Sequence, residues 1–137
     1  MTRVPSSVRD QVRLRAGARC EYCLLPDKYS SYGFHVDHII PVNRHEGSDE
    51  MLKLAWACFR CNTTKAGDIA SYDYETGTEL LTPLFNPRTQ VWNDHFELAG
   101  PLIIGKSSVG RVTVRILEMN SEKQLNVRQL LIDTSRW

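Results

Sequence analysis

Cys20-Glu21-Tyr22-Cys23 and Cys58-Phe59-Arg60-Cys61 form two Cys-x2-Cys pairs, separated by residues 24–57. Four thiolates in two such pairs are the ligand set of a tetrahedral zinc ion, because each pair presents two sulfurs at a suitable separation. Four protein ligands leave no open coordination position, so we predict a structural zinc ion at Cys20, Cys23, Cys58 and Cys61. Four unrelated buried thiols are the alternative. A redox role is disfavoured, since neither pair has a βαβ context.

The composition is that of one globular domain, or of one domain with an appended subdomain. The chain has 137 residues, of which 42% are hydrophobic, and this length is enough to bury a core without disulfides. Its 17 Lys and Arg against 16 Asp and Glu give a formal net charge of +1. This balance excludes a histone-like basic coat, but it does not exclude a local basic patch.

The sequence also indicates the cellular compartment. No apolar run approaches the length of a membrane span, and residues 1–10 contain no apolar signal region. Paired cysteines without a signal region are typical of a reducing compartment, where they bind metal more often than they form disulfides. We therefore expect a cytoplasmic protein with no membrane partner and no small-molecule cofactor.

Three elements are expected in the first half: a helix over residues 7–17, a short strand over 34–40 that Pro41 ends, and an apolar run over 54–57 that enters a helix over 58–65. Ser7 and Asp10 resemble a capping box, and Gly17 can close the first helix. We expect zinc to hold the first helix region to the later helix, with the strand between them.

Beyond residue 72 we expect turns and short elements: turns at 73–77 and 86–88, strands over 80–85 and 102–105, and helices over 109–119 and 127–132. Val112, Ile116 and Met119 would face inward from the first of these helices. No stretch has the composition of a linker. Residues 72–137 are therefore expected to pack on residues 1–71 as an extension.

Two further motifs are His35-Val36-Asp37-His38-Ile39-Ile40-Pro41 and Cys61-Asn62-Thr63-Thr64-Lys65. Together with the cysteines they resemble the HNH endonuclease family, in the group whose ββα-metal hairpin is clamped by a four-cysteine zinc site. The strong resemblance covers residues 16–67. Two stretches of the tail are also similar to stand-alone members of the family, Leu84-Phe85-Asn86-Pro87-Arg88 and Trp92-Asn93-Asp94-His95-Phe96.

The resemblance implies a role for each matching residue. Asp37 would be a ligand of a catalytic metal, His38 the general base, and Asn62 the second protein ligand of that metal. Lys65, one helical turn after Asn62, would meet a phosphate. The family usually has an Asn that ties the loop at the position of Lys53, so the geometry of this loop is in question.

The chemistry of these side chains fits hydrolysis of a phosphodiester bond. The attacking water needs a proton acceptor near neutral pH, and histidine has the side-chain pKa suited to this role. A carboxylate and an amide oxygen are hard ligands that suit Mg²⁺ or Mn²⁺. In a regular strand, however, Asp37 points with His35 and away from His38. Unless the strand ends or twists there, His35 and Asp37 form the pair instead.

The resemblance therefore implies an α+β fold, with a zinc-clamped ββα-metal core over residues 1–71 and a small β-plus-helix extension over 72–137. The predicted function is metal-dependent endonuclease cleavage of DNA with one catalytic Mg²⁺ or Mn²⁺ ion. A partner protein could supply targeting to a chain of near-neutral charge. The alternatives are an inactive zinc-ribbon module that binds nucleic acid or protein, and a purely structural interaction domain.

Basic residues near the motifs are candidate contacts to the nucleic-acid backbone, namely Lys65, Arg60, Arg44 and Lys53. Isolated basic residues are often only solvated, so the alternative is that these side chains lie at the surface without contacting nucleic acid. His35 either supports the metal site indirectly or fills the strand.

Overall fold

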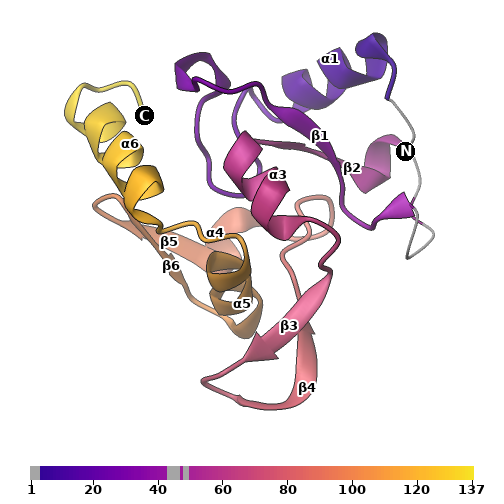
Figure 1. Ribbon diagram of the computed structural model, residues 1–137, viewed down its shortest axis with the longest axis vertical. Helices are drawn as coiled ribbons and strands as arrows, with labels where there is room; N and C mark the ends of the chain where they lie inside the picture. The colour runs from indigo at the N-terminus through magenta and orange to yellow at the C-terminus, as the bar shows by residue number, and fades with distance from the viewer. Residues whose placement is uncertain (1–3, 43–46, 48–49) are drawn as a thin grey trace.

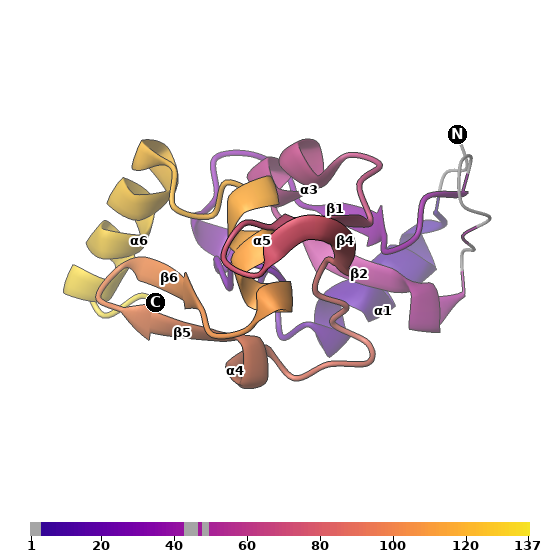
Figure 2. The ribbon, with the colours of Figure 1, turned by 90° about the horizontal axis from the view of Figure 1, so that it is seen from below.

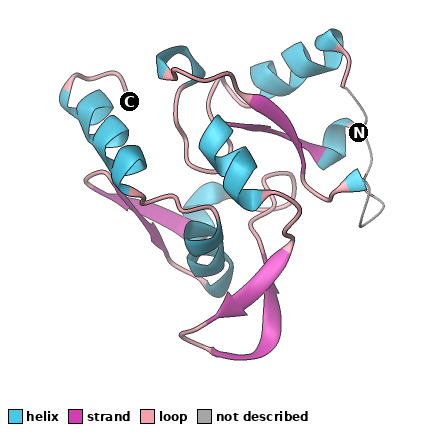
Figure 3. Ribbon diagram, viewed as in Figure 1, coloured by secondary structure: helices cyan, strands magenta, loops and turns pink. Residues whose placement is uncertain are grey.

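The computed structural model describes residues 4–42, 47 and 50–137. Its fold is α+β, with helices and three two-stranded antiparallel sheets arranged around one connected core (Figures 1 and 3). The elements of the first half are α1 (Ser6–Arg15), η1 (Asp27–Tyr29), β1 (His35–His38), η2 (Met51–Lys53), β2 (Leu54–Ala57) and α3 (Phe59–Lys65). Those of the second half are β3 (Ala70–Asp73), β4 (Gly77–Pro83), α4 (Trp92–His95), β5 (Phe96–Ala99), β6 (Leu102–Gly105), α5 (Ser108–Ile116) and α6 (Glu122–Asp133).

Strands β1 and β2 and helix α3 form a ββα unit. The strands pair antiparallel, with His35 opposite Ala57 and His38 opposite Leu54. Every residue of β2 is buried, because its strand lies between other parts of the chain. Cys58 follows β2 directly and caps the N-terminus of α3, so the strand and the helix are joined without a loop.

Helix α1 packs against β2 and is tied to it by Arg15. The Arg15 guanidinium donates hydrogen bonds to the carbonyl oxygens of Met51 at 2.7 Å and Leu54 at 2.6 Å. Gly17 follows the helix with a φ of +67°, a conformation that favours glycine, as the sequence suggested. The expected capping box is wrong, because the helix begins after Pro5 and no side chain caps it.

The second half is built from two hairpins, β3–β4 and β5–β6, and two helices. The expected strand over 102–105 is β6. The expected helix over 109–119 is α5, which ends earlier, at Ile116; Val112 is buried in it, Ile116 is half-buried, and the buried Met119 lies beyond the end of the helix. The expected strand over 80–85 is shifted, since β4 covers Gly77–Pro83. Strand β5 was missed, and α6 is longer than the expected helix over 127–132.

The two halves contact each other at the segment between Cys20 and Cys23 and at the C-terminal part of α3. Trp92 Nε1 donates to the Tyr22 carbonyl at 2.8 Å, and the Thr64 hydroxyl donates to the Leu117 carbonyl at 2.9 Å. Arg88 forms an ion pair with Glu21. A division between residues 71 and 72 falls inside β3. Helices α1 and α6 lie toward opposite ends of the molecule in both views (Figures 1 and 2).

Candidate metal centre and catalytic site

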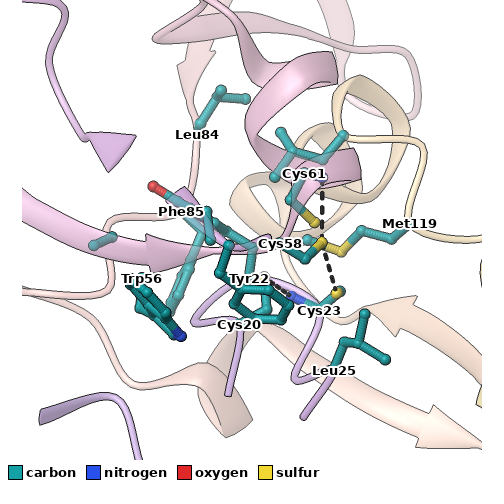
Figure 4. Close-up of a cluster of buried hydrophobic side chains, with 14 of the residues drawn as sticks. Cys20, Tyr22, Cys23, Leu25, Trp56, Cys58, Cys61, Leu84, Phe85 and Met119 are labelled. Carbon is teal, nitrogen blue, oxygen red and sulfur yellow. Dashed lines mark hydrogen bonds between the residues drawn. The ribbon is translucent and has the colours of Figure 1, made fainter. Parts of the chain in front are cut away.

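The four cysteines lie together in the core and are positioned to bind a metal ion. Cys20 and Cys23 come from the loop after α1, whereas Cys58 and Cys61 begin α3 (Figure 4). All four are buried, and their sulfur atoms lie within 4.8 Å of one another, with 3.7 Å between those of Cys23 and Cys58. Zn–S bonds of about 2.3 Å in a tetrahedron separate the sulfurs by about 3.8 Å. The spacing therefore fits a structural zinc ion.

Hydrogen bonds to sulfur set the geometry of each pair. The Cys23 N–H donates to Cys20 Sγ and the Cys61 N–H to Cys58 Sγ, both at 3.4 Å. Side-chain hydrogen bonds with the other cysteines, Cys20 first, hold the pKa of Cys58 well below its ordinary value, whereas burial raises that of Cys20. The cluster therefore favours a thiolate at Cys58, and thiolate is the form that binds metal.

Arg128 of α6 supports a charged centre at this place. Its side chain is 2% exposed and donates to the Pro101 and Met119 carbonyls, the latter at 2.7 Å, and to Asn120 Oδ1 at 3.2 Å. No carboxylate of the described residues pairs with it. Burial lowers the pKa of Arg128, and the sulfurs of the cluster, Cys23 first, oppose this shift. Because zinc with four thiolates is a dianion, a buried guanidinium beside it is a fitting counter-charge.

Asp37 lies in β1 and is almost fully buried, with 4% of its surface exposed. The Tyr22 hydroxyl donates to Asp37 Oδ2 at 2.6 Å. The Lys65 ammonium lies 3.2 Å from Oδ1 and 3.1 Å from Oδ2. Burial raises the pKa of Asp37 above its ordinary value, although Lys65 and Tyr22 oppose the rise. Burial also raises the pKa of Tyr22, so the phenol remains a hydrogen-bond donor to the carboxylate.

Lys65 ends α3 in the interior. It is 1% exposed, and its ammonium also donates to the carbonyl oxygens of His38 at 3.3 Å and Ile39 at 3.2 Å. The sequence led us to expect this lysine at a phosphate. The position that the structure gives it is instead that of a buried cation enclosed by Asp37 and two backbone oxygens.

His35 and Asp37 share the face of β1 that is turned toward α3. The His35 ring lies 6.2 Å from the Phe59 ring of that helix, and Asp37 contacts Lys65 at its other end. The half-buried His38 is the last residue of β1, and the chain bends directly after it, so strict alternation along the strand need not hold at His38. His38 is still near enough that its charge lowers the pKa of Asp37.

The remaining predicted residues are dispersed around this unit. Asn62 is half-buried on α3, three residues before Lys65 and on the same helix face. Arg60 is half-buried on α3, Lys53 is exposed at the end of η2, and Arg44 lies outside the described residues. The Lys53 carbonyl accepts a hydrogen bond from the Ile39 N–H at 3.0 Å. The loop is thus tied to β1 by a backbone contact where the family usually uses an Asn side chain.

Sequence reasoning missed two contributors to the site. Tyr22 lies between the paired cysteines Cys20 and Cys23, yet its hydroxyl reaches Asp37, so it connects the zinc side of the core to the carboxylate. An aromatic residue within a cysteine pair gave only a weak signal of burial. For Arg128 no signal was present, because its neighbours are brought together only by the tertiary fold.

These features define a ββα unit joined to a four-cysteine metal site. Residues 20–67 match the model of the family described as HNH endonuclease. The match spans both cysteine pairs, β1, β2 and α3, and it confirms the resemblance for this part of the chain. Comparisons with curated proteins and with solved structures find no match. None of the described helices is long and apolar enough to cross a membrane.

Proposed function

We propose that the protein is a metal-dependent endonuclease that hydrolyses phosphodiester bonds in DNA, with His38 as the general base. The observation that carries this proposal is the HNH family match over residues 20–67, which contains His38, Asp37 and Asn62. Residues 1–71 would form the nuclease core and residues 72–137 an extension. The free cysteines suit the reducing cytoplasm. A partner protein could supply DNA targeting.

The donor set fits a hard divalent cation. Asp37 and Asn62 would hold one Mg²⁺ or Mn²⁺ ion through a carboxylate and an amide oxygen. A carboxylate offers about four acceptor positions, and Tyr22 and Lys65 together leave some of them free. When bound, the metal would stabilise negative charge on the phosphate. Lys65 would compete with the cation for Asp37, which predicts weak metal binding in the absence of DNA.

The protein groups have separate tasks in this reaction. Tyr22 holds the Asp37 carboxylate in place through its hydroxyl. His38 would accept a proton from the attacking water, and its half-buried position leaves it accessible to solvent. The zinc site would keep α3, with Asn62, in a fixed position against β1, with His38, and so set the geometry on which catalysis depends.

An inactive binding module is the second candidate. Both oxygens of Asp37 already have partners, and Lys53 stands where the family usually has Asn. A buried carboxylate with a permanent ammonium partner is a plausible purely structural pair. The family match does not favour this candidate over an enzyme, because it covers the whole ββα segment.

Supercoiled plasmid incubated with zinc-loaded protein and Mg²⁺ or Mn²⁺ tests the proposal. Nicked or linear DNA should appear only when the added metal is present. The variant Asn62→Ala should retain zinc but lose activity, with partial recovery at high metal concentration. Absence of cleavage by folded, zinc-loaded wild type under every metal condition would favour the inactive module.

A further inference from the structure

A hollow of about 320 Å³ lies where the residues after α6 meet the loop after α1 and the η1 turn. Four basic side chains line it, Arg13, Arg19, Lys28 and Arg136, and Asp27 is its one acidic side chain. These residues come from segments far apart in the sequence. The net charge of the whole chain is only +1, so such a concentration of positive charge is local.

The one acidic side chain of the hollow neutralises only one of its basic side chains. Arg13 forms a bidentate pair with Asp27, at 2.6 Å and 3.0 Å. Arg19 donates to the Leu24 carbonyl at 3.0 Å. Among the described residues, no carboxylate pairs with Arg19, Lys28 or Arg136.

Aromatic rings position these three cations without neutralising them. The Arg19 guanidinium lies 5.1 Å from the Trp137 ring centroid. The Lys28 ammonium and the Arg136 guanidinium lie 5.0 Å and 6.0 Å from the Tyr29 centroid. Cation–π contacts use the charge but leave N–H donors available. Like charges held close together repel one another, and a bound anion would remove this repulsion.

A neighbouring hollow provides a contrast within the same molecule. It has about 330 Å³ and lies on the other side of the Arg13–Asp27 pair. Its charged lining, Arg9 and Arg13 with Asp10 and Asp27, is balanced. The excess of basic over acidic side chains therefore distinguishes the first hollow from its neighbour.

We propose that the hollow at Arg19, Lys28 and Arg136 binds phosphate groups of the nucleic-acid backbone. The proposal rests on the proposed function and extends it, because it places a DNA contact away from the cleavage site. The C-terminal end of the chain and the end of β1 that carries His38 lie toward opposite ends of the molecule (Figures 1 and 2). The DNA held here would thus flank the scissile phosphate. Contacts of this kind depend on charge and not on base sequence.

The test uses Lys28→Gln/Arg136→Gln, since both side chains are exposed and removing their charge should not disturb the core. The control is Lys106→Gln/Lys123→Gln, which removes the same charge at exposed positions outside the hollow. Binding of a labelled DNA duplex is measured without added divalent metal, at several salt concentrations, in a His38→Ala background. Loss of two phosphate contacts should lower the salt slope of log affinity by about 1.8 and weaken binding at least about tenfold at 0.1 M salt.

The control pair should leave the slope close to that of the parent. Equal slopes for the two double variants would overturn the proposal. Inorganic phosphate is titrated in parallel, and a site that binds phosphate but leaves DNA affinity unchanged on mutation would also overturn it. Because binding is measured in the His38→Ala background, failure of the wild type to cleave DNA would refute the proposed function without refuting this site.

Discussion

The Lys65 ammonium lies 3.1 Å from Asp37 Oδ2, and both side chains are almost completely shielded from solvent. This ion pair joins the end of α3 to the middle of β1. The same helix begins with two cysteines of the metal cluster and carries Asn62, so the pair fixes the helix on the strand that bears His38. The buried pair is thus part of the link between the zinc site and the predicted catalytic residues.

Replacing Lys65 with Met should destabilise the protein by about 3–5 kcal/mol, because the Asp37 carboxylate would stay buried without its cation. Urea unfolding of the zinc-loaded protein measures this. The double variant Lys65→Met/Asp37→Asn should be more stable than the sum of the two single changes predicts. If Lys65 lay at the surface and contacted DNA, the result would be different. Lys65→Met would then have the wild-type free energy of unfolding and would lower the salt slope of DNA binding by about one.

Loss of one zinc ligand should affect the whole molecule. Cys61→Ser should release the metal and lower the melting temperature by more than about 10 °C, because structural zinc contributes directly to folding. Elemental analysis and thermal melts of the variant and the wild type decide this. A variant that melts with the wild type would show that the four cysteines are merely buried thiols.

Arg128→Met should accelerate zinc release to a chromogenic chelator, because the dianionic centre would lose its buried counter-charge. Arg128→Lys should retain part of the effect of arginine, while Lys123→Met, an exposed change on the same helix, should release zinc at the wild-type rate. If Arg128→Met lowered only the free energy of unfolding and left the zinc release rate unchanged, Arg128 would act solely through its hydrogen bonds to the Met119 and Pro101 carbonyls.

The ββα unit and its cysteines were accessible from the sequence because their signals are local. Cys-x2-Cys spacing fixes the geometry of each pair, and Pro41 marks the end of the short run 34–40 in which β1 lies. The sequence did not predict that the Lys65 side chain points into the interior. Helix periodicity places Lys65 on the face of Asn62, but only the packing of β1 brings Asp37 to that face.

The elements of the second half were harder to predict from the sequence, because their local hydrophobic patterns are weak. Helix α6 buries Gln124, Arg128 and Leu131, so polar residues occupy much of its inward face and the hydrophobic pattern covers only its C-terminal part. Strand β5 is four residues long and only Phe96 in it is buried. Its pairing depends on the turn at Gly100, whose φ of +59° brings β6 back alongside it.

The central claim is that His38 acts as the base in metal-dependent DNA cleavage, and plasmid cleavage by His38→Ala tests it most directly. His35→Ala is the matched control, since His35 is an exposed histidine of the same strand. With zinc content and melting temperature equal to those of wild type, His38→Ala should cleave about 10²- to 10⁴-fold more slowly, while His35→Ala retains activity. Cleavage by His38→Ala at the wild-type rate would contradict the claim, and loss of activity in His35→Ala alone would transfer the role to His35.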